Sequence, residues 1–163
     1  MNVKTSFLKN KIHKNSPNKN IFPVTTTIDS DHNLIIGGCS IEDLVRKYDS
    51  PLYILDEITL RNSCRAYKKA LEKYYPGPSL PIYASKANSS IFMSNLIASE
   101  GFGLDAVSEG ELLTALKGVV PNEKIVFHGN NKSDKEIEFA IKNNIKVIVD
   151  LSLIHISEPT RPR

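Results

Sequence analysis

The sequence has 163 residues, 40% of them hydrophobic, and a formal net charge of +3. This length allows one ordinary domain with a buried core, but no apolar run approaches the roughly 20 residues of a membrane span or forms the apolar centre of a secretory signal. We therefore expect a soluble protein of the cytoplasm without a membrane partner.

The positive charge is concentrated at the two ends of the chain. Residues 1–20 hold five lysines and no acid, and residues 151–163 hold two arginines and one glutamate, so residues 21–150 carry a net charge of −3. A mildly acidic body argues against a nucleic-acid-binding surface. We interpret residues 1–20 as a disordered basic leader, because a lysine- and asparagine-rich stretch of this kind cannot bury enough apolar surface to fold.

Cysteine and histidine are too sparse to predict a metal site. Cys39 and Cys64 have no CxxC partner, and the four histidines are scattered along the chain. This usage is typical of a reduced cytosolic protein, and we expect no metal ligand.

Residues 21–50 are predicted to form a short extension of strand and helix that precedes the main domain, residues 51–150. The main domain begins with a predicted strand, 52–55, and a helix that Asp56 or Thr59 can cap. The sequence Pro-Gly-Pro at 76–78 ends this helix. Its expected inward stripe has steps of four and three: Leu60, Cys64, Tyr67, Leu71 and Tyr74.

Strands and helices then alternate regularly. Apolar runs predict strands at 80–84, 104–107, 125–128 and 147–150. A helix follows each of the first three, beginning near Ser90, Ser108 and Ser133. Two of these starts have the S-x-x-E form of a capping box. The residues expected to face inward from the three helices are Met93, Leu96, Ile97, Leu112, Leu113, Leu116, Ile137, Ala140 and Ile141.

The spacing of the units indicates the fold class, which we predict to be α/β. Strands recur about every 22 residues, which is natural for the first units of a (β/α)8 TIM-like barrel and short for an open doubly wound sheet. A flavodoxin-like sheet is the alternative, but no G-x-G-x-x-G or Walker sequence follows any strand. Catalytic groups of a barrel lie at the C-terminal ends of its strands.

One strand end carries a candidate nucleophile. The run Ile-Tyr-Ala-Ser-Lys-Ala-Asn at 82–88 delivers Lys86 into a turn of small residues, and an amine held there can form a Schiff base with a carbonyl. Asp105 lies within an apolar strand and needs a partner if buried, so it is a site candidate. His128 can be a ligand, but a core histidine is the favoured interpretation. Ser108 is interpreted as a helix cap. The remaining strand-end residues are Gly129, Asn130 and Asp150. Asn130, Asn131 and Lys132 are interpreted as loop and cap residues, with an anion at their backbone amides as the alternative.

Assembled in order, these segments resemble the pyridoxal-phosphate-dependent decarboxylases of the alanine-racemase-like barrel fold, and most closely the diaminopimelate decarboxylases. The forms S-E-G-E-L and H-G-N-N-K-S favour that branch over decarboxylases of ornithine, arginine or carboxynorspermidine, which stay open as alternatives. The matching stretches are L-I-I-G-G at 34–38, P-L-Y-I-L-D at 51–56, Y-A-S-K-A-N at 83–88, G-L-D-A-V-S-E-G-E-L at 103–112 and H-G-N-N-K-S at 128–133.

The resemblance implies a chemistry and a site. It makes Lys86 the lysine of the internal aldimine with pyridoxal 5′-phosphate, and it places Asp105 and His128 at the cofactor. The implied reaction is the decarboxylation of meso-diaminopimelate to L-lysine, the last step of lysine biosynthesis, in a homodimer. A different class, a non-catalytic homologue that binds a partner, also stays open, although a scaffold without cofactor has no reason to keep Lys86.

The resemblance covers only part of the family's fold. About four of eight barrel strands are expected here, and the family's phosphate loop, ring-stacking histidine and C-terminal β domain come later in its chains. Residues 151–161 resemble the translation of a sequencing adapter, with an ordinary strand and proline-rich end as the alternative. We therefore expect residues 151–163 to be non-native and the chain to be an inactive N-terminal fragment.

Overall fold

The computed structural model describes residues 21–149. The predicted basic leader (1–20), the predicted non-native tail (151–163) and Asp150 lie outside these residues. The chain divides into two compact units, 1–63 and 64–163, and the division falls inside one long helix. None of the helices between residues 21 and 149 is both long and apolar enough to cross a bilayer.

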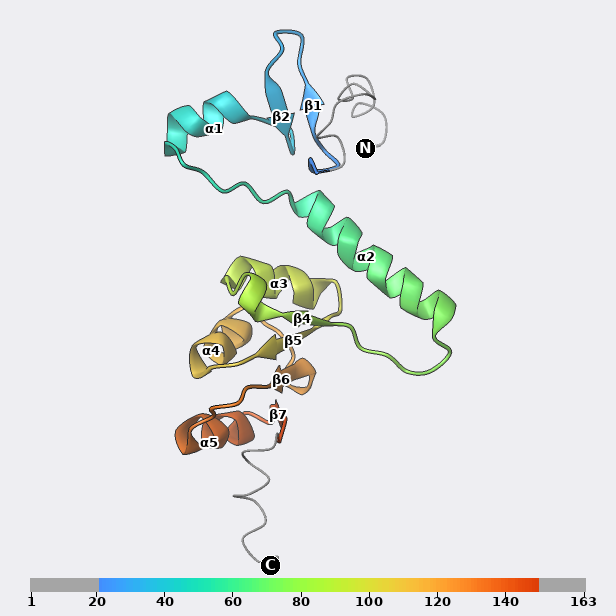
Figure 1. Cartoon of the computed structure of the whole chain (residues 1–163), viewed down its shortest axis with the longest axis vertical. Coiled ribbons are helices and arrows are strands. Elements are labelled where there is room, and N and C mark those ends of the chain that lie inside the picture. Colours follow the sequence, from blue (N-terminus) through green and yellow to red (C-terminus); the bar gives the residue numbers. More distant parts are fainter. Residues whose placement is uncertain (1–20, 150–163) are drawn as a thin grey trace, which may run out of the picture. The chain divides into compact units, whose positions relative to one another are not determined.

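The first unit is a small antiparallel sheet with one short helix (Figure 1). Its three strands pair in chain order, and the helix begins directly after the third. The hydroxyl of Thr25 donates to Asp56 at 2.9 Å and accepts from the Gly37 amide at 2.9 Å, so it links the sheet to the segment that precedes the long helix. The elements are β1 (Thr27–Ile28), β2 (Leu34–Ile36), β3 (Cys39–Ser40) and α1 (Ile41–Tyr48).

The prediction of a strand at residues 52–55 is wrong. Within residues 21–149 this segment pairs with no other strand, and Tyr53 and Leu55 are 98% and 50% exposed. An extended segment becomes a strand only when a neighbour satisfies its backbone groups. The apolar character of residues 52–55 is therefore not sufficient to predict a strand.

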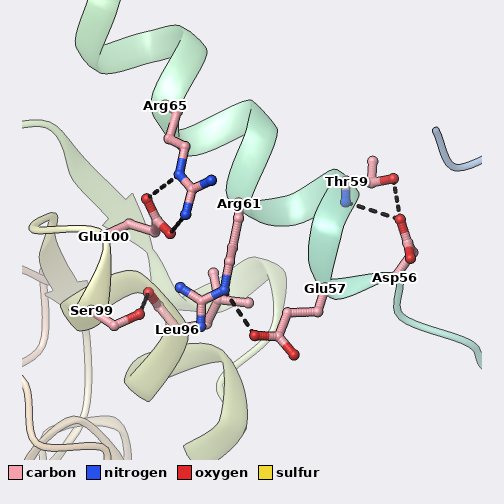
Figure 2. A network of polar contacts seen from close by, with 8 residues as sticks. All are labelled: Asp56, Glu57, Thr59, Arg61, Arg65, Leu96, Ser99 and Glu100. Atoms are coloured by element: carbon pink, nitrogen blue, oxygen red, sulfur yellow. Dashed lines mark hydrogen bonds and ion pairs between the residues drawn. The ribbon is translucent and has the colours of Figure 1, made fainter. Parts of the chain in front are cut away.

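The long helix α2 (Glu57–Tyr74) begins as predicted. The carboxylate of Asp56 accepts from the Thr59 amide at 2.9 Å, which is an N-cap bond (Figure 2), and the helix ends before Pro-Gly-Pro. Its predicted inward stripe is only partly correct, because Cys64 is buried while Tyr67 and Tyr74 are 69% and 75% exposed.

The part of α2 that belongs to the second unit, from Cys64 onward, makes polar contacts with Glu100 of the same unit. Arg65 holds Glu100 through two bonds, Nε to Oε2 at 3.0 Å and Nη2 to Oε1 at 2.9 Å (Figure 2). Lys68 donates to the Glu100 carbonyl at 3.1 Å. The inward face of this part of the helix therefore includes Arg65 and Lys68 and leaves Tyr67 exposed. Apolar periodicity does not reveal such polar contacts.

The second unit is a parallel sheet in which β4 (Ile82–Ala84), β5 (Gly103–Ala106), β6 (Ile125–Phe127) and β7 (Lys146–Val147) pair in chain order. The connecting helices all lie on the same side of the strands (Figure 1). A doubly wound sheet would place helices on both sides. Sequential strands with helices on one side are barrel units, so the predicted fold class is confirmed. The connecting helices are α3 (Ile91–Ser99), α4 (Glu109–Lys117) and α5 (Asp134–Lys142), with short turns η1 (Ser85–Ala87) and η2 (Asn122–Lys124).

Strand register separates the two faces of this sheet. Leu104 pairs with Ile125 and Ala106 with Phe127, and all four are buried under the helices. Alternate residues point to the other face, where Ile82 is 44% exposed. Among the expected helix residues, Leu112 and Ala140 are buried and α3 behaves as predicted, whereas Leu113 and Ile141 are exposed.

Serine caps begin all three of these helices, as expected. Ser90, Ser108 and Ser133 each accept a hydrogen bond from the backbone amide three residues later. The capping box predicted at Ser133 and Glu136 is complete. The box predicted at Ser108 is only half formed, because the Glu111 carboxylate accepts from the Val107 amide and the Ser85 hydroxyl instead.

Gly118 follows the last residue of α4 and lies close to α3. Its φ of −76° is not left-handed, so the glycine is not required for a turn. It is required for packing, because a Cβ at Gly118 would lie 2.3 Å from the Ser94 Cβ on α3. By contrast, a Cβ at Gly110 would meet only the Ser108 hydroxyl, at 3.9 Å.

These two glycines give a matched pair of substitutions. Gly118→Ala should lower the free energy of unfolding by about 1–3 kcal/mol, because α3 and α4 must move apart. Gly110→Ala should leave it unchanged or raise it by up to about 1 kcal/mol, because alanine favours the helix. Urea unfolding followed by circular dichroism measures both, and equal stability of the two variants would contradict the packing account.

Candidate functional site

The candidate nucleophile lies in an irregular turn at the end of a strand. Lys86 is the middle residue of η1, directly after β4, and is exposed. The preceding residue, Ser85, is 2% exposed. The turn therefore buries its serine and presents its lysine at the C-terminal edge of the sheet, which is the edge where barrel enzymes place their chemistry.

Asp105 lies on the neighbouring strand at the same edge. In β5 it is in register with Ala84 of β4 and Val126 of β6, so it belongs to the face that the helices leave uncovered. Its Oδ1 atom is buried and accepts no hydrogen bond from any residue between 21 and 149. A buried carboxylate oxygen without a donor is costly, and such an atom is a natural binding point for a ligand that brings a donor.

His128 directly follows β6, the next strand of the sheet. Its amide donates to the Ala106 carbonyl at 2.8 Å, so the chain keeps its pairing just beyond β6. Its Nδ1 lies 3.8 Å from Asp105 Oδ1, which is too long for a hydrogen bond. The favoured interpretation of a core histidine is wrong, because the side chain is 51% exposed.

The three predicted site residues are thus brought to one edge. Lys86 and His128 each come two residues after members of one register row, Ala84 and Val126, and Asp105 lies in that row between them. The parallel register therefore places an amine just after β4, a carboxylate within β5 and an imidazole just after β6. This set suits a ligand with a carbonyl and several polar substituents.

Two further residues of these strand ends, Ser108 and Lys132, have structural contacts. Ser108 caps α4, as interpreted. The Lys132 ammonium donates to the Gly129 carbonyl and lies 5.8 Å from the centre of the Phe127 ring, so it packs on its own loop. Asp150 lies outside the described residues.

Glu111 has a role at this edge that the sequence did not predict. Its Oε2 accepts from the Ser85 hydroxyl at 2.7 Å and from the Val107 amide at 2.7 Å. It therefore joins the turn of Lys86 to the end of the strand of Asp105. The S-x-x-E pattern drew attention to Glu111 only as a capping residue, and its link to a serine 26 residues earlier leaves no local signal.

Two groups near this edge have shifted pKa values. Burial raises the pKa of the Tyr83 hydroxyl, which is on β4 and donates weakly to the Asn88 carbonyl at 3.4 Å. Hydrogen bonds from Ser133 and from the Glu109 amide lower the pKa of Glu136. The Glu136 contribution to stability is therefore present above its unfolded pKa and is lost as the pH falls through the lower folded value.

Comparisons with known proteins identify relatives of this chain. The family described as pyridoxal-dependent decarboxylase, pyridoxal binding domain, matches residues 57–156. Diaminopimelate decarboxylase of Synechocystis sp. is 46% identical over 143 residues, which cover 83% of this chain and 30% of that protein. The chain thus spans about a third or less of the length of these relatives.

Solved structures agree with the sequence relatives. Diaminopimelate decarboxylase from M. jannaschii superposes with a TM-score of 0.72 and 33% identity, covering 82% of this chain and 32% of that one. The same enzyme in complex with L-lysine superposes with a TM-score of 0.68 and 34% identity, over the same shares of the two chains.

The donor-less carboxylate predicts an unusual response to substitution. Asp105→Asn should leave the free energy of unfolding unchanged or raise it by up to about 1 kcal/mol, because a charge with a buried, donor-less oxygen is removed. The matched control is Asp56→Asn, whose carboxylate accepts from Thr25 and Thr59 and whose loss should cost about 1–3 kcal/mol. Urea unfolding measures both. If Asp105→Asn destabilises as much as Asp56→Asn, Asp105 is a structural residue.

Proposed function

The chain belongs to the family of pyridoxal-dependent decarboxylases through its pyridoxal binding domain, and from this premise we propose that its parent protein decarboxylates meso-diaminopimelate to L-lysine with pyridoxal 5′-phosphate. The observation that carries the proposal is the exposed Lys86 in the turn after β4, next to the strand that carries Asp105. The buried Oδ1 of Asp105 has no donor among residues 21–149. Such a pair fits an aldehyde-bearing cofactor with polar ring substituents.

The residues present fit this cofactor. When bound, pyridoxal 5′-phosphate supplies an electron sink that accepts the electron pair left by departing carbon dioxide. Lys86 would hold the cofactor through its amine. Asp105 would accept a hydrogen bond from it, which gives the buried oxygen the donor it lacks. His128, half exposed at the same edge, would contact it from the third strand.

The chain's own groups then have separate tasks. The Lys86 amine is carried by a short turn rather than by a strand, so it can move without unpairing the sheet. Its Nζ atom can accept or return a proton. Asp105 Oδ1 lies 3.8 Å from His128 Nδ1, so the two side chains are neighbours at this edge. Orientation by these three groups is the protein's share of the catalysis.

The names of the relatives support this substrate. The Synechocystis and M. jannaschii relatives named above are diaminopimelate decarboxylases, and the M. jannaschii enzyme was solved with L-lysine. The proposal places the parent protein in the last step of lysine biosynthesis, in the cytoplasm and as a homodimer. It gives the 163-residue chain no turnover alone, because the sheet face that carries Asp105 is uncovered within the described residues.

The cofactor lysine can be tested in the full-length parent protein. The purified protein should absorb in the visible range after loading with pyridoxal 5′-phosphate, and Lys86→Ala should abolish that band together with the release of carbon dioxide from meso-diaminopimelate. Lys117→Ala, at the exposed end of α4, is the control and should change neither. An unchanged spectrum in Lys86→Ala would refute the role of Lys86.

The substrate and the dependence on the rest of the protein can be tested together. The parent should form L-lysine from meso-diaminopimelate faster than it decarboxylates ornithine or arginine, and the 163-residue chain should form no measurable product from any of the three. Chromatography of the amino-acid products measures this. Faster turnover of ornithine would reassign the substrate, and turnover by the 163-residue chain would show that it already contains a working pocket.

A further inference from the structure

The turn that carries Lys86 is fixed by a residue that is distant in sequence. Ser85 is 2% exposed, and its hydroxyl donates to Glu111 Oε2 at 2.7 Å. A bond this short from a hydroxyl to a carboxylate is typical of charge-assisted hydrogen bonds, which are about twice as strong as neutral ones. The residue immediately before Lys86 is therefore held in place from α4.

The same oxygen atom also holds the next strand. Glu111 Oε2 accepts from the Val107 amide at 2.7 Å, and Val107 is two residues beyond Asp105. A single carboxylate atom thus ties the lysine turn to the end of the strand that carries Asp105. This contact therefore limits how far Lys86 and Asp105 can move apart, and these are two of the groups that the proposed function assigns to the cofactor.

The following unit provides an internal comparison. Glu136 occupies the same position in α5 as Glu111 does in α4, the third residue of the helix, and it also reaches back, to the Glu109 amide at 3.1 Å. Glu136 completes the capping box of its own helix, whereas Glu111 gives up that box and bonds to Ser85. The departure from the box is what connects Glu111 to the lysine.

We infer that Glu111 is a positioning residue of the cofactor site: through Ser85 and the Val107 amide it fixes Lys86 relative to Asp105. The inference rests on the proposed function, in which Lys86 and Asp105 bind the same cofactor. Glu111 itself is not assigned a contact with cofactor or substrate. Its loss should loosen the turn at 85–88 while the sheet remains intact.

The first measurement is amide hydrogen exchange in the 163-residue chain. Glu111→Ala should speed exchange in residues 85–88 about tenfold, because the turn loses a charge-assisted bond, while strand amides 125–127 stay protected. Glu111→Gln should retain most of the protection, because one amide oxygen can accept both bonds. Glu136→Ala is the matched control and should leave residues 85–88 unchanged. Unchanged exchange at 85–88 in Glu111→Ala would overturn the inference.

The second measurement is cofactor affinity in the full-length parent, titrated by its visible absorbance. Glu111→Ala should weaken binding of pyridoxal 5′-phosphate about tenfold, and Glu111→Gln and Glu136→Ala should bind almost as tightly as the wild type. If exchange at 85–88 rises but affinity does not fall, Glu111 is merely structural and the inference is overturned. If the wild-type parent does not bind cofactor at Lys86, the proposed function fails, and the exchange result still decides whether Glu111 fixes the turn.

Discussion

The parallel register of β4, β5 and β6 is the constraint on which the rest of this structure depends. It pairs Ala84 with Asp105 and Asp105 with Val126. Since side chains alternate between faces, this register separates the apolar layer under the helices from the open face that carries Asp105. A shift of one residue would exchange the two. Asp105 would then be buried under α4, and Leu104 would take its place at the site edge.

Glutamates at the third position of α4 and α5 secure this register at its C-terminal edge. Each reaches back to the preceding unit, Glu111 to Ser85 in the turn after β4 and Glu136 to the amide of Glu109, the first residue of α4. Carboxylates near helix N-termini are favoured by the helix dipole, so a stabilising preference of each helix also joins neighbouring units. Fold stability and site geometry therefore share the same bonds.

Much of the fold could be predicted from local patterns. The strands after residue 80, the serine caps and the barrel class follow from periodicity and capping chemistry, which act within a few residues. The strand at 52–55 and the inward stripe of α2 could not, because pairing and the Arg65–Glu100 contact depend on partners distant in sequence. At the site, Lys86, Asp105 and His128 were found from strand ends, but the exposure of His128 and the bonds of Glu111 required the register itself.

The account therefore centres on one edge of one sheet, where three strands bring an amine, a carboxylate and an imidazole together. Its most direct test is a crystal structure of the full-length parent protein with pyridoxal 5′-phosphate. The account predicts continuous electron density between Lys86 Nζ and the cofactor, with a cofactor donor within hydrogen-bonding distance of Asp105 Oδ1. Density that joins the cofactor to another lysine, or an Asp105 carboxylate bonded only to protein, would contradict it.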